Sequence, residues 1–188
     1  MSLSSALIAV EQRQDLSAEA AQAAFDDLFV GTASDNEIAR FLVALADKGE
    51  TVDELIGATR SMRSKMITIK APKNAIDIAG TGGDHTNTLN ISTAVAFVVA
   101  ACGVPVAKHG NRAASSTSGS SDVLRALGVN LEPELPVLEQ CLAGSKLCFL
   151  FAPRHHPAMR RVADIRKKLG RRTIFNLLGP LTNPANVK

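Results

Sequence analysis

A glycine-rich segment followed by polar side chains is the first sign of chemistry in this sequence. Residues 80–84 read Gly-Thr-Gly-Gly-Asp, and Thr88, Asn90, Ser92 and Thr93 lead from them into an apolar run. Glycines let a backbone approach a ligand closely, and the N-terminus of a following helix adds partial positive charge. The segment lacks the Gly-Lys-Ser/Thr end of a P-loop and the spaced glycines of a dinucleotide site. It predicts a phosphate-binding loop; the alternative is a tight strand-to-helix turn with Ser92 as N-cap.

A second polar loop spans residues 108–120. It begins Lys-His-Gly-Asn-Arg, and it contains two cations, Lys108 and Arg112, and five Ser or Thr hydroxyls. An ammonium group and hydroxyl donors suit a phosphate-rich ligand, and Gly110 and Gly119 allow the loop to bend. The alternative is a flexible Ser-rich linker. Because the loop follows an apolar run and precedes a helix, it is predicted to bind phosphate as well.

Other catalytic arrangements are missing from the sequence. There is no Ser/His/Asp nucleophile elbow and no Cys/His spacing typical of zinc sites. His109 alone is weak support for catalysis, because a single histidine is more often a structural hydrogen-bond partner. The three cysteines, Cys102, Cys141 and Cys148, lie among apolar neighbours and are expected to be reduced, buried thiols.

The two loops need strands and helices that bring them to one edge. Three apolar runs predict strands at residues 75–79, 104–107 and 147–151. Helices are expected to begin near Ser92, Ser121 and Glu134. This alternation is typical of parallel β–α units, whose ligands gather beyond the carboxyl ends of the strands. An α/β domain is therefore predicted over residues 71–188.

The first 70 residues have a different, helical pattern. A short helix is followed by three amphipathic runs with N-caps at Ser17, at Ser34 with Glu37, and at Thr51 with Glu54. Gly31 and Gly49 are expected to end the first two of these runs. No reactive groups cluster here, so residues 1–70 are predicted to be a structural helical domain that offers an apolar face to a partner subunit.

Composition excludes several classes of function. The chain has 188 residues, a net charge of +3, no Trp or Tyr and only seven Phe, which argues against a base-stacking RNA module. The longest apolar stretch, residues 94–104, is far shorter than the roughly 20 residues that span a bilayer, and no secretory signal is evident, which predicts a cytoplasmic protein. Residues 151–188 carry nine basic and one acidic side chain, which attract either nucleic acid or a small anion.

The motifs, in their order and spacing, strongly resemble those of anthranilate phosphoribosyltransferases. The likeness rests on Gly80-Thr81-Gly82-Gly83-Asp84 with Asn90-Ile91-Ser92-Thr93, on Lys108-His109-Gly110-Asn111-Arg112, and on Arg172-Thr173-Ile174-Phe175-Asn176 with Leu178-Gly179-Pro180-Leu181. It extends through the whole chain and includes the layout of a helical domain before an α/β body. It implies a small N-terminal helical domain and a partial parallel-sheet α/β domain of the nucleoside phosphorylase/phosphoribosyltransferase type.

The resemblance also implies a reaction and its site. The family transfers the phosphoribosyl group of phosphoribosyl pyrophosphate (PRPP) to the amine of anthranilate with Mg2+, in tryptophan biosynthesis. By similarity, one group of residues would hold PRPP: Gly80, Gly83, Asp84, Thr88, Asn90, Ile91, Ser92 and Thr93. A second group would close over its phosphates: Lys108, His109, Gly110, Asn111, Arg112, Ala113, Ala114, Ser115, Ser116 and Ser120. Ser92 would also contact magnesium, and Gly80, Asn111 and Arg166 would face anthranilate.

Three consequences of the resemblance remain expectations. The chain should form a homodimer through the helical domain and should not need a strong general base, because the amine of anthranilate is weakly basic. The family continues beyond residue 188 with more of the sheet and an Asp-Glu pair that binds magnesium, so the 188-residue chain is expected to have little or no activity, an unpaired sheet edge and exposed apolar surface. Thr117 stands where the family often has a longer polar or basic side chain.

Two other functions are weighed against this reading. The basic segment at residues 154–172 could serve a non-catalytic relative that binds nucleic acid or only dimerises. A nucleoside phosphorylase shares the architecture, but its motifs differ from the stretch at residues 108–112. The retained substrate motifs favour the transferase over both.

Overall fold

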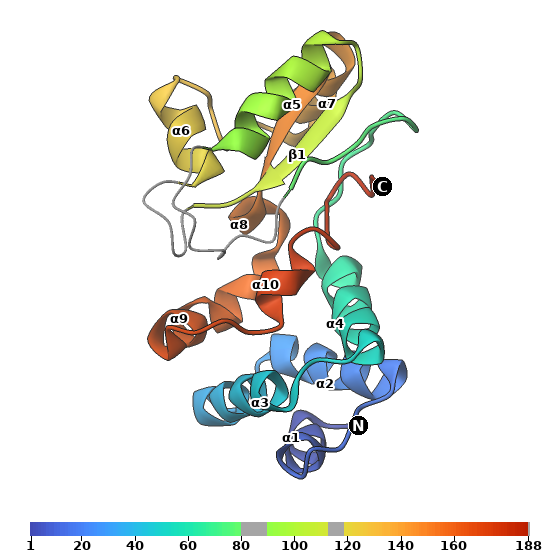
Figure 1. Cartoon of the computed structure of the whole chain (residues 1–188), viewed down its shortest axis with the longest axis vertical. Helices are drawn as coiled ribbons and strands as arrows, with labels where there is room; N and C mark the ends of the chain where they lie inside the picture. Colours follow the sequence, from blue (N-terminus) through green and yellow to red (C-terminus); the bar gives the residue numbers. More distant parts are fainter. Residues whose placement is uncertain (80–89, 113–118, 188) are drawn as a thin grey trace. The chain divides into compact units, whose positions relative to one another are not determined.

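The computed structural model describes residues 1–79, 90–112 and 119–187 (Figure 1). The described chain divides into two compact units. One contains residues 1–66 and 156–182, and the other contains residues 67–155 and 183–188. Sequence analysis places one boundary near residue 70 and does not anticipate that residues 156–182 return to the helical unit. Within the described ranges no helix is both long enough and apolar enough to cross a membrane.

The helical unit consists of four N-terminal helices and a later helical segment. The first four are α1 (Leu3–Glu11), α2 (Ala18–Val30), α3 (Asp35–Lys48) and α4 (Val52–Lys65). The later segment contains the 3-10 helix η1 (Pro157–Met159), α9 (Arg160–Leu169) and α10 (Phe175–Leu178). The predicted N-caps are confirmed: the Ser17 hydroxyl accepts the N–H of Ala20, and the Ser34–Glu37 and Thr51–Glu54 capping boxes are both complete. Gly31 ends α2 in the left-handed conformation, as expected.

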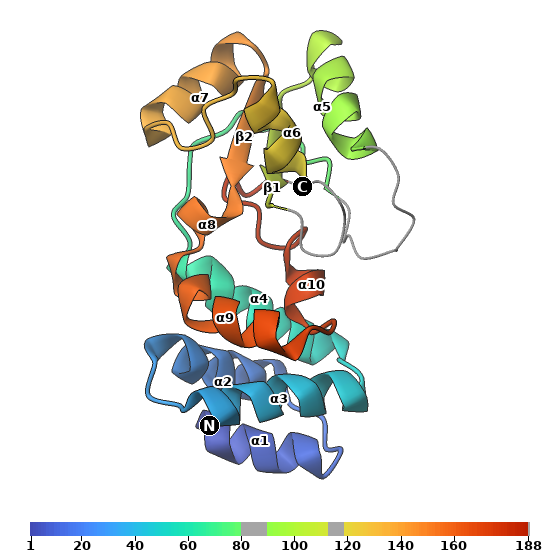
Figure 2. The same cartoon turned by 90° about the vertical axis from the view of Figure 1, so that its left-hand side faces the viewer.

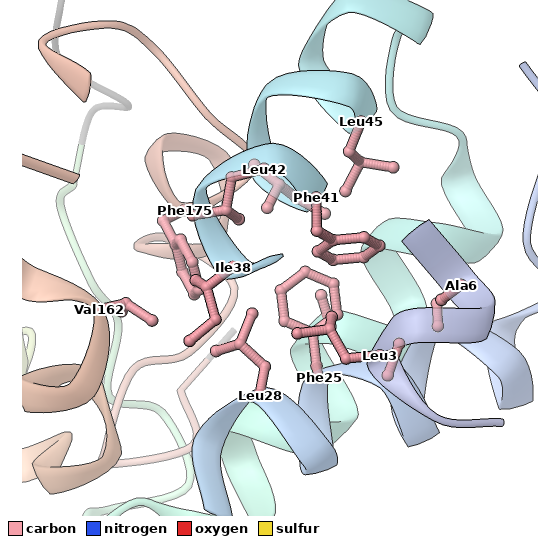
Figure 3. Packing of buried hydrophobic residues seen from close by; sticks show 14 of the residues in the cluster. Leu3, Ala6, Phe25, Leu28, Ile38, Phe41, Leu42, Leu45, Val162 and Phe175 are labelled. Atoms are coloured by element: carbon pink, nitrogen blue, oxygen red, sulfur yellow. The ribbon is translucent and has the colours of Figure 1, made fainter. Parts of the chain in front are cut away.

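A phenylalanine cluster lies at the centre of this unit (Figure 3). The rings of Phe25 and Phe41 meet edge to face with centroids 5.6 Å apart, and Phe175 contacts Phe25 in the same way at 5.8 Å. Val162 and Ile165 of α9 belong to the same buried cluster. Residues 156–182 join the helical unit because they supply apolar side chains that complete its core.

The α/β unit contains a parallel pair of strands. β1 (Val106–Gly110) pairs with β2 (Leu147–Phe151) in the register Val106–Leu147 to Gly110–Phe151. The predicted strand at residues 147–151 is confirmed with the same bounds, whereas the one predicted at 104–107 begins two positions later. The predicted strand at 75–79 is wrong as a strand among the described residues, because only Ile76 forms a bridge, with Val106.

Helices cover both faces of the strands (Figure 2). α7 (Leu135–Gly144) packs on Ala107, Cys148 and Leu150, whereas α5 (Ile91–Ala101) packs on Val106 and Leu147. α6 (Ser120–Ala126) contacts Phe149 and Phe151, and α8 (Ala152–His155) follows β2 directly. Successive strand residues point to opposite faces, so one strand pair serves both layers of helices.

The expectation of three buried cysteines is correct only for Cys148. Cys102 and Cys141 are exposed, because Cys102 caps the end of α5 and Cys141 lies on the outer part of α7. The expected apolar surface is present on α5, where Ile91 and Val98 are 58% and 63% exposed. The expected free sheet edge is found on β2, which pairs only with β1 among the described strands.

Candidate functional site

The structure describes about half of the residues predicted to form the site. Nine positions singled out by the sequence lie outside the described residues: Gly80, Gly83, Asp84, Thr88, Ala113, Ala114, Ser115, Ser116 and Thr117. The others fall at the start of α5, at the end of β1, at the start of α6 and in α9. The described part of the site is therefore built from the ends of regular elements.

The first group lies at the N-terminus of α5. Asn90, not Ser92, is the N-cap, and its carbonyl accepts the N–H groups of Thr93 and Ala94 at 3.0 and 3.1 Å. Ile91 and Ser92 thus fall in the first turn, where the helix dipole attracts an anion. Thr93 is buried, and its Oγ1 has no hydrogen-bond partner within the described parts of the chain. An unpaired buried hydroxyl in this turn is available to a polar ligand.

Lys108 and His109 lie near the carboxyl end of β1. Lys108 is only 3% exposed, and its Nζ donates a hydrogen bond of 2.7 Å to the carbonyl of Ile78. The main-chain N–H of His109 donates to Oδ1 of Asp77 at 3.0 Å. Burial lowers the pKa of Lys108, and the nearby carboxylate of Asp77 opposes that change. The site therefore contains a buried ammonium, and among the described residues Asp77 opposes the lowering of its pKa.

Gly110 and Asn111 carry the chain from β1 towards α6. A Cβ at Gly110 would collide with Ser120 Oγ and lie 2.6 Å from the ring of Phe149, so this position has no room for a side chain. The Asn111 carbonyl accepts the Ser120 hydroxyl and the Ser121 N–H, both at 3.4 Å. The loop therefore returns closely over the start of α6, as a close-approach glycine allows.

Residues from two of these groups line the same cavity. It has a volume of about 390 Å³ and an apolar wall that includes Phe97, Leu124 and Phe149. Both Thr93 and Lys108 line it. A hydroxyl and an ammonium from different elements thus share one concave surface, which is the usual arrangement of a polar ligand-binding pocket.

Arg166 lies in the helical unit, in α9, whereas Asn111 lies in the α/β unit. The guanidinium of Arg166 stands 5.3 Å from the ring centre of Phe175, a cation–π contact, and burial lowers its pKa. Its planar fork suits a carboxylate such as that of anthranilate.

Several arginines of the basic segment at residues 154–172 form ion pairs within the protein. Arg161 binds Asp35 at 2.6 Å and also the Ala33 carbonyl, and Arg171 binds Asp47 at 2.5 Å. Arg154 lies 3.8 Å from Glu134. These pairs neutralise several cations that a nucleic-acid surface would need exposed.

Sequence analysis missed Asp77. The signal was present, because an acidic residue interrupts the otherwise apolar run at 75–79. Its contact with the His109 N–H and its influence on the Lys108 pKa depend on the neighbouring strand.

The described residues include one predicted magnesium ligand, Ser92. In the parts of the chain that the structure describes, no three His, Cys, Asp or Glu side chains gather in a way that could hold a metal. Ser92 supplies one hydroxyl oxygen at the start of α5. Mg2+ prefers oxygen ligands, including substrate phosphates, and a Ser or Thr hydroxyl contributes one such ligand in P-loop sites, so the Ser92 hydroxyl could do the same beside the phosphates.

Comparison with known proteins agrees with this geometry. An anthranilate phosphoribosyltransferase of Novosphingobium aromaticivorans is 62% identical over 168 residues, covering 89% of this chain and 51% of that protein. One from Rhizobium etli is 54% identical over 182 residues, covering 97% of this chain and 54% of its own. The chain spans about half the length of the relatives it matches.

Solved structures give the same result. The anthranilate phosphoribosyltransferase of Thermus thermophilus matches with a TM-score of 0.89 and 45% identity, over 96% of this chain and 55% of that one. The Saccharomyces cerevisiae enzyme in complex with PRPP and Mg matches with a TM-score of 0.87 and 29% identity, over 97% and 55%.

Family models match both parts of the sequence. Residues 4–66 match the helical bundle domain and residues 72–188 match the a/b domain of one glycosyl transferase family. The predicted kinship with anthranilate phosphoribosyltransferases is confirmed at this level. The chain belongs to this glycosyl transferase family, with a helical bundle domain followed by an a/b domain.

Proposed function

We propose that this chain binds PRPP and forms part of an enzyme that transfers its phosphoribosyl group to the amine of anthranilate. The observation that carries the proposal is the shared cavity wall of Thr93 and Lys108, at the start of α5 and near the end of β1. Relatives with the same two domains are named for this transferase, and one was solved with PRPP and Mg. The reaction would belong to tryptophan biosynthesis in the cytoplasm.

The phosphates of PRPP need positive charge and hydrogen-bond donors. Lys108 supplies an ammonium with three N–H donors, of which one bonds to Ile78. The first turn of α5 adds backbone N–H groups and the hydroxyls of Ser92 and Thr93. The other proposed contacts come from Asn90 and Ile91, from His109 to Arg112, and from Ser120.

Ser92 would help to hold a magnesium ion, which would supply positive charge to the departing pyrophosphate. Within the chain, Lys108 stabilises the same charge. Substitution at the anomeric carbon breaks the bond to the pyrophosphate oxygen and forms a bond to the anthranilate nitrogen, whose proton passes to water. Because the transition state is cation-like, holding the leaving group and aligning the amine matter most.

Anthranilate would be held by Asn111 and Arg166, with the guanidinium on its carboxylate. The amine is weakly basic and largely unprotonated at neutral pH, so no strong general base is required, and His109 would help to orient the substrate. The helical domain would form the interface of a homodimer.

The proposal predicts that PRPP binds in the presence of Mg2+ and that Lys108→Ala removes most of this binding. Loss of a charge-assisted contact to phosphate should weaken the affinity at least about tenfold. Isothermal titration calorimetry measures the affinity, and Lys70→Ala, which removes an exposed lysine of the same unit, serves as the matched control.

Absence of PRPP binding by the unaltered, folded chain, or equal loss in the two lysine variants, would contradict the proposal. A titration with random duplex DNA tests the alternative. Tight, strongly salt-dependent binding that requires Arg160 and Lys167 would favour nucleic acid instead.

A further inference from the structure

The parallel backbone ladder between the segment at residues 75–79 and β1 ends after one pair of hydrogen bonds, which we call one rung. The Ile76 N–H donates to the Pro105 carbonyl at 2.9 Å, and the Ala107 N–H donates to the Ile76 carbonyl at 2.9 Å. In a parallel ladder the next rung would join the Ala107 carbonyl to the N–H of Ile78, and the Ile78 carbonyl to the N–H of His109. Neither of these two bonds forms between the described residues of the two segments.

Side chains take the place of the second rung. Asn183 Nδ2 donates to the Ala107 carbonyl at 2.8 Å, and Lys108 Nζ donates to the Ile78 carbonyl at 2.7 Å. The His109 N–H donates to Oδ1 of Asp77 at 3.0 Å. These three substitutions satisfy buried backbone groups that would otherwise be unpaired, and they explain why the predicted strand at 75–79 is reduced to one bridge.

Two of the three replacing groups are charged. Lys108 is almost fully buried, and among the described residues Oδ2 of Asp77 is buried without a hydrogen-bond partner. A buried carboxylate oxygen of this kind is costly unless its charge interacts with an opposite one. An amide at residue 77 could accept the His109 N–H equally well, so hydrogen bonding alone does not explain a carboxylate here.

Among the described residues, the other titratable groups that line the cavity with Lys108 or follow it in β1 are two thiols and an imidazole. Cys141 and Cys148 line the same cavity, and burial, Cys141 and Asp77 raise the pKa of Cys148 to about 12, so that thiol stays neutral near pH 7. His109 is the next residue of β1 and is tied to Asp77 through its main chain. Among these groups only Asp77 is an acidic side chain that favours the charged form of Lys108.

We propose that Asp77 is a positioning residue that keeps the buried Lys108 charged and in place near the end of β1, ready for a phosphate of PRPP. This inference rests on the proposed function. Asp77 lies just before the glycine-rich loop at residues 80–84, and Lys108 begins the loop at residues 108–120. Each side chain bonds to the backbone of the other segment, Asp77 to the His109 N–H and Lys108 to the Ile78 carbonyl.

The decisive variant is Asp77→Asn, which keeps a hydrogen-bond acceptor for His109 and removes the charge. Without Asp77, burial acts unopposed, so the pKa of Lys108 should fall below its value in the unaltered chain. An NMR pH titration of the Lys108 side chain, assigned with Lys108→Met, measures this change without any ligand. Asp53→Asn, an exposed aspartate of the helical unit, is the matched control and should leave Lys108 unchanged.

PRPP affinity gives the functional readout. Only the charged lysine binds phosphate well, so affinity should fall as pH rises through the Lys108 pKa, and in Asp77→Asn this loss should occur at lower pH. Where the variant's lysine is neutral and the unaltered one is charged, binding should be weaker by about tenfold. In the Lys108→Met background, Asp77→Asn should cause no further loss.

The possible results separate the two proposals. If the unaltered chain does not bind PRPP, the proposed function fails, while the ligand-free titration still tests the effect of Asp77 on Lys108. An unchanged Lys108 pKa in Asp77→Asn, or an equal loss of affinity with and without Lys108, would overturn the inference.

Asp77→Glu provides a second test if Asp77→Asn does not fold. It keeps the charge on a longer side chain, and the Lys108 pKa should stay near that of the unaltered chain. A marked fall in Asp77→Glu would mean that the detailed hydrogen-bond geometry, and not the charge, controls Lys108, and it would also overturn the inference.

Discussion

Gly110 occupies a position in the candidate site where even a Cβ atom would not fit. The backbone here passes so close to Phe149 and Ser120 that a methyl group would overlap both. Two residues close to it in the chain are proposed to contact the substrates: Lys108 would bind PRPP and Asn111 would bind anthranilate. A shift of this backbone would move both side chains together, because they share one short stretch of chain.

We therefore predict that Gly110→Ala weakens PRPP binding and destabilises the chain by about 1–3 kcal/mol, the usual range for overpacking. Calorimetry and urea denaturation measure the two effects. Gly144→Ala is the control, because a Cβ there meets nothing within 4 Å and the glycine lies at the end of α7. Equal stability and affinity in the two variants would argue against the tight packing at Gly110.

At the scale of elements, two similar capping boxes differ in their surroundings. Glu37 of α3 lies near the surface and bonds to Ser34 and Ser4. Glu54 of α4 is fully buried: its Oε1 accepts the Leu16 N–H at 3.0 Å, and its Oε2 accepts the Thr51 N–H and the Lys48 ammonium. Both motifs thus add a tertiary contact, but the one made by Glu54 is buried, whereas the bond from Ser4 to Glu37 is exposed.

Because the surroundings of the two glutamates differ, replacing each by alanine should lower the free energy of unfolding by different amounts. Glu54→Ala should lower the free energy of unfolding by about 2–3 kcal/mol, because it leaves the buried Leu16 N–H without its acceptor and removes one of the two carboxylates that bind Lys48. Glu37→Ala removes only partly exposed contacts and should cost clearly less. Urea denaturation of the two variants measures the difference, and similar losses would contradict the structural distinction.

At the scale of the whole molecule, the chain spans about half the length of the relatives it matches. The outer side of α5 is apolar, with Ile91, Val95 and Val98 exposed, although helices that are hydrophobic all round are normally buried. The described site also offers magnesium only Ser92, whereas the family resemblance implies a further acidic pair beyond residue 188.

We predict that the purified 188-residue chain has little or no transferase activity even if it binds PRPP. Product formation from PRPP, anthranilate and Mg2+ can be compared directly with that of the Thermus thermophilus enzyme at matched concentrations. Turnover close to that of the longer enzyme would contradict this prediction and would mean that the described groups suffice for catalysis.

The sequence by itself determined the local features of this protein. Caps at Ser17, Ser34 and Thr51 and the strand at 147–151 could be read from it, because they depend on neighbouring residues and on apolar periodicity. The two loops proposed to bind phosphate were predicted from their glycines and polar side chains. The family followed from the order and spacing of the motifs.

Only the tertiary structure decided the features that depend on distant segments. Phe175 completes the core of the helical unit, and Glu54 is buried against Leu16, although neither fact can be read from local sequence. The segment at 75–79 has the apolar pattern of a strand, but side chains of Asp77, Lys108 and Asn183 occupy its second rung. Hydrogen bonds and burial are satisfied by whichever groups the folded chain brings together, and that choice is not encoded in any one stretch of sequence.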